Sequence, residues 1–107
     1  MKHFLLIYEF VPNYLELRPK FRDVHLAKAW AAKNSGDLVL AGALADPVDG
    51  AILIFKGDSP AAAEEFARTD PYVLNGLVKK WSVRPWVTVV GDMAMTPVHP
   101  TPDKATA

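Results

Sequence analysis

Cysteine is absent from this 107-residue chain, and neither sign of charge is in excess. Without cysteine, disulfides, thiolate nucleophiles and cysteine-ligated zinc or iron–sulfur sites are excluded. Twelve Lys and Arg residues balance twelve Asp and Glu residues, whereas binding to nucleic acid or anionic lipid requires many clustered cations. The sequence therefore predicts no nucleic-acid partner and favours a small-molecule substrate bound at one local site.

Long hydrophobic runs are also missing. The N-terminal run from Phe4 to Tyr8 is far shorter than the roughly 18–20 residues that a membrane span requires, and no small-residue cleavage site follows it. We therefore expect no membrane segment and no signal peptide, and a cytoplasmic protein. Half of the residues are hydrophobic, which is typical of one globular domain at this length.

The order of apolar and helix-forming segments predicts the fold class. The expected strands are residues 4–10, 38–44, 51–55 and 81–90, and the expected helices are residues 18–33 and 61–68, with a short helical turn at Asp70-Pro71. Gly36 is placed to end the first helix, and Pro85 indicates an edge or bulged position because proline cannot donate to a ladder. This order is typical of an α+β, ferredoxin-like βαββαβ fold, with a four-stranded antiparallel sheet and two helices on one face.

The sheet predicted in this way has more apolar surface than two helices can cover. Three of its four strands are apolar on both faces, yet the helices lie on one face only. A second copy packed sheet to sheet would cover the other face, so we expect a homodimer. Residues 1–92 form the expected domain, and residues 93–107 form a proline-rich C-terminal tail that we expect to be extended or disordered.

Two segments carry the residues most suited to chemistry. Arg18, Arg22 and His25 lie at spacings i, i+4 and i+7, so they project from one side of the first helix. Two cations beside an imidazole suit an anionic substrate, although the same spacing is typical of the solvated face of an amphipathic helix. Asp70 before Pro71 is typical of an N-cap. A carboxylate has capacity for several bonds, so Asp70 can also orient one ring nitrogen of His25 while the other acts as a base.

Aromatic residues are candidates for the wall of a substrate-binding pocket, with packing in the core as the alternative for each of them. The candidates are Tyr8, Trp30, Tyr72 and Trp86. His3 and His99 have no partner at the spacing of metal ligands, so we expect no metal. Phosphate-loop, dinucleotide-binding and nucleophile-elbow motifs are absent from the sequence, and we expect no cofactor.

Three segments of the chain match motifs of a known family. Arg22-Asp23-Val24-His25-Leu26 matches an R-x-x-H-L segment, Ala41-Gly42 matches an Ala-Gly pair of the second strand, and residues 67–86 match a closing segment. Over roughly residues 3–90 the chain thus resembles the YCII-related (YciI-like) family. The resemblance implies a dimeric α+β barrel with His25 and Asp70 as the active pair. Ala43 stands where many relatives have proline, so we expect a differently shaped pocket rim.

The residues and the resemblance together predict a cofactor-independent enzyme that moves a proton on a small anionic or phenolic organic substrate. His25 is the expected acid or base, Asp70 orients it, and Arg22 and Arg18 hold the anion. Imidazoles titrate near neutrality, which suits a lyase, dehydrohalogenase or isomerase. Fold relatives include cofactorless monooxygenases, so oxygen chemistry stays open. The alternative from another class is a non-catalytic metabolite-binding or accessory protein with the same pocket.

Overall fold

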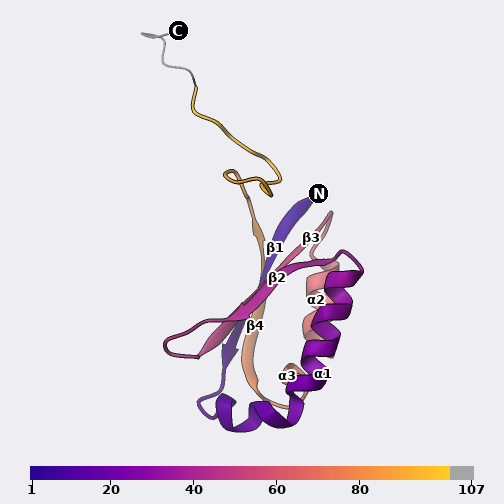
Figure 1. The fold of residues 1–107 in the computed structure, drawn as a ribbon, viewed down its shortest axis with the longest axis vertical. Coiled ribbons are helices and arrows are strands. Elements are labelled where there is room, and N and C mark those ends of the chain that lie inside the picture. Colours follow the sequence, from indigo (N-terminus) through magenta and orange to yellow (C-terminus); the bar gives the residue numbers. More distant parts are fainter. Residues whose placement is uncertain (102–107) are drawn as a thin grey trace.

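The computed structural model describes residues 1–101 and shows an α+β fold built on one four-stranded antiparallel sheet (Figure 1). The strands are β1 Lys2–Phe10, β2 Leu38–Ala43, β3 Gly50–Gly57 and β4 Val78–Trp86. They are arranged in the order β2-β3-β1-β4, and all neighbouring strands are antiparallel. The predicted ferredoxin-like arrangement is confirmed.

Three helices connect these strands. They are α1 Tyr14–Asn34, α2 Ala61–Thr69 and the short α3 Pro71–Leu74. The two longer helices, α1 and α2, lie side by side on one face of the sheet (Figure 1). Within residues 1–101, no helix has both the length and the apolar character needed to cross a membrane.

The first helix begins earlier than the sequence predicts. It starts at Tyr14 rather than Arg18, and it contains Pro19 within its second turn. Proline there removes one helical hydrogen bond and bends the helix without ending it, and Figure 1 shows α1 changing direction near its N-terminal end. The C-terminal end agrees with the prediction, because Gly36 follows the helix with a φ of 92°.

The last strand is displaced toward the N-terminus relative to the prediction of residues 81–90. It spans Val78–Trp86 and pairs with β1 from Phe10 back to His3. Trp86 pairs with His3, and β1 begins at Lys2, so only one β1 residue remains beyond this pair. Pro85 lies in this strand at the edge of the sheet, as proline requires.

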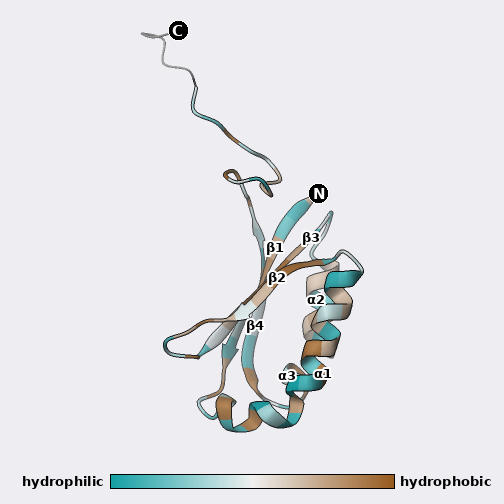
Figure 2. Ribbon diagram, viewed as in Figure 1, coloured by the Kyte–Doolittle hydropathy of each residue, from teal (hydrophilic) through white to brown (hydrophobic). Residues whose placement is uncertain are grey.

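The core lies between the sheet and the helices. Alternate residues of β1, namely Phe4, Leu6, Tyr8 and Phe10, are all buried on this side. The register pairs three of them with Ala51, Leu53 and Phe55 of β3, which are buried as well. Figure 2 shows hydrophobic residues in the middle part of the sheet, where the strands overlap in this view. The two-residue period of the strand thus directs its large apolar side chains toward the helices.

The opposite face of the sheet carries a second set of apolar side chains. Leu5 and Ile7 of β1 pair with Ile54 and Ile52 of β3, and all four are only partly buried. Neither α1 nor α2 lies on this face (Figure 1). We call it the open face of the sheet, and its apolar surface is the feature from which the homodimer was predicted.

The segment after β4 is more ordered than the prediction of an extended or disordered tail. The backbone N–H groups of Thr96 and Val98 donate to the carbonyl oxygens of Thr88 and Val89, at 3.1 and 2.8 Å. Gly91, with a φ of 115°, supplies a conformation suited to reversing the chain. Residues 93–98 therefore fold back on the chain that follows β4, and residues 102–107 of the predicted tail lie outside the described residues.

Candidate active site

His25 and Asp70 meet between α1 and the start of α3. His25 Nδ1 lies 2.8 Å from Asp70 Oδ1, which is a hydrogen-bond distance. A carboxylate only accepts hydrogen bonds, so Nδ1 carries the proton and donates it toward Asp70. This assignment leaves Nε2 as the nitrogen with the free lone pair.

Asp70 is fully buried, and both of its oxygens are used. Oδ1 accepts from the backbone N–H of Tyr72 at 3.0 Å, which is the N-cap bond of α3, as well as from His25. Oδ2 accepts from the Tyr8 hydroxyl at 2.6 Å. The N-cap interpretation and the His25-orienting interpretation of Asp70 are thus compatible, since one carboxylate serves both geometries.

His25 is held in a fixed orientation with one edge open. Its ring stacks on Tyr72, with centroids 3.8 Å apart and planes 6° apart, and its side chain is 14% exposed. Within the part of the chain that the structure describes, every buried side-chain nitrogen or oxygen has a hydrogen-bond partner. Since the only hydrogen bond of the ring in this part is through Nδ1, Nε2 is accessible from the cavity that His25 lines.

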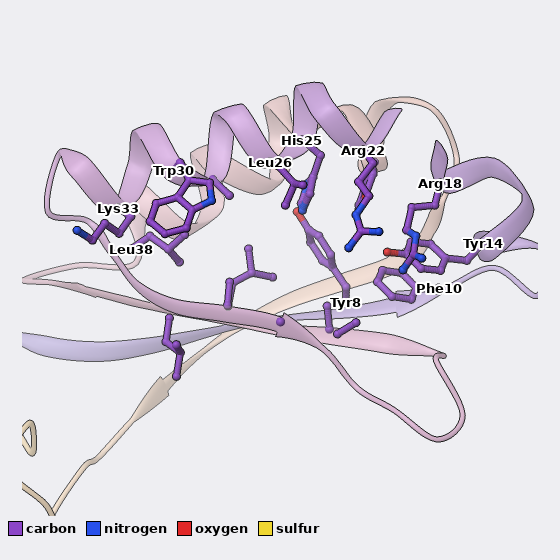
Figure 3. A pocket seen from close by; sticks show the side chains of 18 of the residues that line it. Tyr8, Phe10, Tyr14, Arg18, Arg22, His25, Leu26, Trp30, Lys33 and Leu38 are labelled. Atoms are coloured by element: carbon purple, nitrogen blue, oxygen red, sulfur yellow. The ribbon is translucent and has the colours of Figure 1, made fainter. Parts of the chain in front are cut away.

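This cavity lies between α1 and β2 and has a volume of about 410 Å³. Arg18, Arg22 and His25 point from α1 toward it, and Tyr8 points toward His25 from the sheet (Figure 3). The three cations of its lining are Arg18, Arg22 and Lys33, and no Asp or Glu belongs to the lining. Neither arginine is in an ion pair within residues 1–101. The cavity therefore presents unbalanced positive charge, which favours an anionic ligand.

Small side chains leave space between α1 and the sheet at this point. Ala29 is one of only two buried residues of α1, with Tyr14 as the other. On β2, Ala41 and Ala43 line the cavity and remain exposed. Larger side chains at these positions would fill the space between the helix and the sheet and exclude solvent. The alanines at these positions leave that space open.

The hydroxyl of Tyr72 lies in the field of the two arginines. Burial raises the pKa of Tyr72 above its ordinary value and Tyr14 raises it further, whereas Arg22 and Arg18 act in the opposite direction. The net direction is upward, so the hydroxyl stays protonated near neutral pH and can donate a hydrogen bond. Tyr72 thus adds a neutral donor to the cationic end of the cavity.

Tyr8 lies in the wall of the cavity and has a second role that the sequence did not predict. It borders the cavity, but its hydroxyl donates to Asp70. Burial is the main cause that raises the pKa of Tyr8, and the adjacent Asp70 charge raises it further. Tyr8 therefore holds Asp70 in place and stays neutral.

Trp86 does not line the cavity, contrary to the prediction. It pairs with His3 in the register, and the two rings lie 6.3 Å apart. Since Pro85 pairs with the helix-facing Phe4, strand alternation turns Trp86 to the open face. The face on which a lone aromatic residue of a strand lies depends on register, which the residue itself does not reveal.

Other cavity residues were missed by the sequence analysis. Phe10 and Tyr14 stack at 3.6 Å and line the cavity together, although they come from different elements. Lys33 is also in the lining, and it follows Arg22 by eleven residues, which is close to three helical turns. Extending the periodicity from Arg18 and Arg22 would have found Lys33, whereas the aromatic stack depends on tertiary contact.

No curated protein matches the sequence. The fold is similar to that of 5-chloro-2-hydroxyhydroquinone dehydrochlorinase from Burkholderia phenoliruptrix AC1100, solved in complex with 2,5-dihydroxybenzoquinone, with a TM-score of 0.70 and 22% identity over 80% of this chain and 94% of that one. It is also similar to a NIPSNAP family protein from Agrobacterium tumefaciens C58, with a TM-score of 0.52 and 15% identity over 87% of this chain and 95% of that one. Residues 1–87 match the YCII-related domain, and the chain therefore belongs to the YCII-related family.

Proposed function

We propose that the protein is a cofactor-independent enzyme that moves a proton on a small anionic or phenolic organic substrate, as a lyase, dehydrohalogenase or isomerase. His25 is the general base, Asp70 orients it, and Arg22 and Arg18 bind the anionic group of the substrate. Tyr72 donates a hydrogen bond beside the arginines. The open Nε2 of His25, facing a cavity with cations and no carboxylate, is the observation that carries this proposal.

The proposed step begins with a substrate whose reacting carbon lies near His25 Nε2. The imidazole takes the proton of a C–H bond adjacent to a carbonyl, and the electron pair of that bond forms a C=C bond. In a dehydrohalogenation the halide leaves with the electron pair of the carbon–halogen bond. In an isomerisation the π pair of the C=O bond moves onto its oxygen, which gives an enolate, and the proton returns at another atom. Asp70 stabilises the imidazolium that forms. Neither reaction changes the overall oxidation state, so His25 and the anion-binding groups are sufficient for it.

The comparisons support this choice of chemistry. The fold neighbour from Burkholderia is a dehydrochlorinase of a chlorinated hydroxyhydroquinone, and its bound dihydroxybenzoquinone is a small oxygen-rich ring. Such a ring ionises to a phenolate, which suits the cationic cavity between α1 and β2. The identity of that neighbour as an enzyme favours catalysis over metabolite binding without turnover.

We also propose that the protein acts as a homodimer in which the open faces of two sheets pack together. Leu5, Ile7, Ile52 and Ile54 are the apolar residues at the centre of this face. Burial of apolar area contributes roughly 25 cal/mol per Å² removed from water, so two such faces stabilise each other. The cavity and His25 lie on the other side of the sheet, where this contact leaves them accessible.

A turnover assay tests the proposed activity. The wild-type protein is incubated with chlorinated hydroxyquinols and halogenated aromatic acids, and halide release and product absorbance are followed. His25→Ala is expected to lower kcat by a factor of about 10² to 10⁴, because this is the usual contribution of a positioned general base. Arg22→Gln is expected to raise KM for anionic substrates with a smaller change in kcat.

The matched control is Lys28→Ala. Lys28 is on α1 close to His25, but it lies over the Phe66 ring outside the cavity lining. Its substitution should leave turnover unchanged. Turnover that persists in His25→Ala would contradict the proposed base. Tight binding of these compounds without turnover would favour the metabolite-binding or accessory alternative.

A further inference from the structure

We propose that the end of the cavity at Trp30 is a second subsite, which binds an apolar extension of the substrate such as a second aromatic ring. This inference rests on the proposed function, since it describes the remainder of the same substrate. The substrate class is then an aromatic acid that extends beyond a single ring. Its anionic end lies at Arg22, its reacting carbon at His25 and its apolar end at Trp30.

Trp30 is the first reason for this subsite. It lines the cavity although its residue is 63% exposed. Within residues 1–101 its indole is in no aromatic stacking pair or hydrogen bond, in contrast to Phe10, Tyr14 and Tyr72. A tryptophan left this open contributes little to the core, but it offers a large apolar surface to a ligand.

The length of the cavity is the second reason. Arg22 and Trp30 are eight residues apart on α1, which corresponds to about 12 Å along the helix axis. Figure 3 shows Arg18 and Arg22 at one end, Trp30 and Lys33 at the other, and His25 between the two groups. A single ring anchored at the arginines would reach His25 and leave the Trp30 end empty.

Volume and polarity agree with this arrangement. The cavity holds about 410 Å³, whereas a benzene-sized ligand fits in a cavity of about 150 Å³. The lining toward Trp30 includes Leu26 and Leu38, which are apolar, and the small Ala29, with Lys33 as the charged residue beside Trp30. Apolar walls recognise area and shape rather than charge, so an aromatic ring suits this end better than a second polar group.

The test compares the binding of benzoate, which has one ring, with that of biphenyl-4-carboxylate, which has two. Isothermal titration calorimetry of the full chain measures both dissociation constants without requiring turnover. The wild-type protein is expected to bind the two-ring acid at least about tenfold more tightly, because a second ring buries further apolar area. Trp30→Ala is expected to abolish this preference and leave benzoate binding unchanged.

Two further variants locate the effect. Arg22→Gln should weaken both acids by the same factor, because both present their carboxylate to the same cations. Val24→Ala removes another exposed apolar side chain of α1, one that lies outside the cavity lining, and should change neither constant. Circular dichroism confirms the fold of each variant, and the exposure of Trp30 makes its replacement compatible with folding.

The outcomes separate this inference from the proposed function. Equal affinity for the two acids in the wild type, or a preference for two rings that survives in Trp30→Ala, would overturn the second subsite. Absence of binding by both acids would overturn it too. If the wild-type protein turns over none of the chlorinated hydroxyquinols and halogenated aromatic acids but keeps the two-ring preference, the proposed enzyme is overturned and the subsite is supported.

Discussion

At the scale of single residues, the site depends on one buried carboxylate. Asp70 is the N-cap of α3 and accepts hydrogen bonds from His25 and Tyr8, and it has no exposed surface. A buried charge is tolerated only when its oxygens are hydrogen-bonded. The residues that orient His25 are therefore also residues that stabilise the fold, and substitutions at these positions change both properties.

Substitution of Tyr8 and Asp70 should reveal this coupling. In Asp70→Asn the amide oxygen can keep the N-cap bond of Tyr72, but the NH₂ group faces the Tyr8 hydroxyl, whose proton then has no acceptor. Asp70→Asn and Tyr8→Phe should each lower the free energy of unfolding by about 1–3 kcal/mol, the cost of a buried polar group without a partner. Urea denaturation of both variants and of the double variant measures the effect. The double variant should lose less than the sum of the two; full additivity would contradict the coupling.

The two raised tyrosine pKa values predict a loss of stability at high pH. Tyr8 and Tyr72 keep their protons in the folded state to a higher pH than the ordinary value of 10.0. Above about pH 10 the unfolded chain binds fewer protons than the folded chain, so the free energy of unfolding falls as pH rises. Each tyrosine contributes up to about 1.4 kcal/mol per pH unit to this slope, and neither contributes below about pH 9.

Urea denaturation between pH 8 and pH 11 measures this slope. Tyr8→Phe removes one of the two titrating groups and should make the decline above pH 10 less steep, even though the variant is less stable at pH 8. A slope that is identical in the wild type and in Tyr8→Phe would contradict the assignment of the effect to Tyr8.

At the scale of elements, α1 contributes more of the cavity lining than any other helix or strand. Its residues Arg18, Arg22, His25, Trp30 and Lys33 line one side, because residues three and four apart lie on the same side of a helix. The helix ends at Asn34, and Gly36 reverses the chain into β2. The position of β2 opposite α1 therefore depends on this short connection.

Two glycines near the cavity offer a matched test of that connection. Gly36 has a φ of 92°, and a Cβ at this position would meet no atom within 4 Å, so only the backbone conformation opposes a side chain. Gly36→Ala should lower the free energy of unfolding by about 1 kcal/mol. Gly42, in β2, has equally open space and no positive φ, so Gly42→Ala should change stability by less than about 0.5 kcal/mol. Thermal denaturation measures both, and equal effects would contradict the explanation.

At the scale of the whole molecule, the helices cover one face of the sheet and the open face retains Leu5, Ile7, Ile52 and Ile54. Monomeric proteins rarely expose large contiguous apolar patches. Self-association on this side of the sheet, away from the cavity, is therefore the arrangement that we propose.

Light scattering tests the homodimer that we propose. The wild-type protein should have the mass of a dimer at micromolar concentration. Ile54→Lys places a charge at the centre of the open face and should give a monomer, because burying an unpaired ammonium group is costly. Val24→Lys, at an exposed position of α1, should remain a dimer. A stable wild-type monomer, or dissociation by Val24→Lys alone, would contradict this interface.

The sequence by itself determined those features that depend on local spacing. Short apolar runs predicted the strands and their succession along the chain, Gly36 predicted the end of the first helix, and Asp70-Pro71 predicted the start of the short helix. The i, i+4, i+7 spacing placed Arg18, Arg22 and His25 on one side of α1. These features follow from the 3.6-residue period of helices, the two-residue period of strands and the capping of helix ends. All three depend on residues that are close together in the chain.

Only the tertiary structure decided the features that join distant segments. The register of β4 against β1 turned Trp86 to the open face, and the packing of α2 on β1 brought the Tyr8 hydroxyl to Asp70, which follows α2. The small residues of α1 and β2 left a cavity only because the two elements lie opposite each other. Contacts of this kind depend on how elements pack, and the packing of an element with a distant partner leaves no local pattern in the sequence.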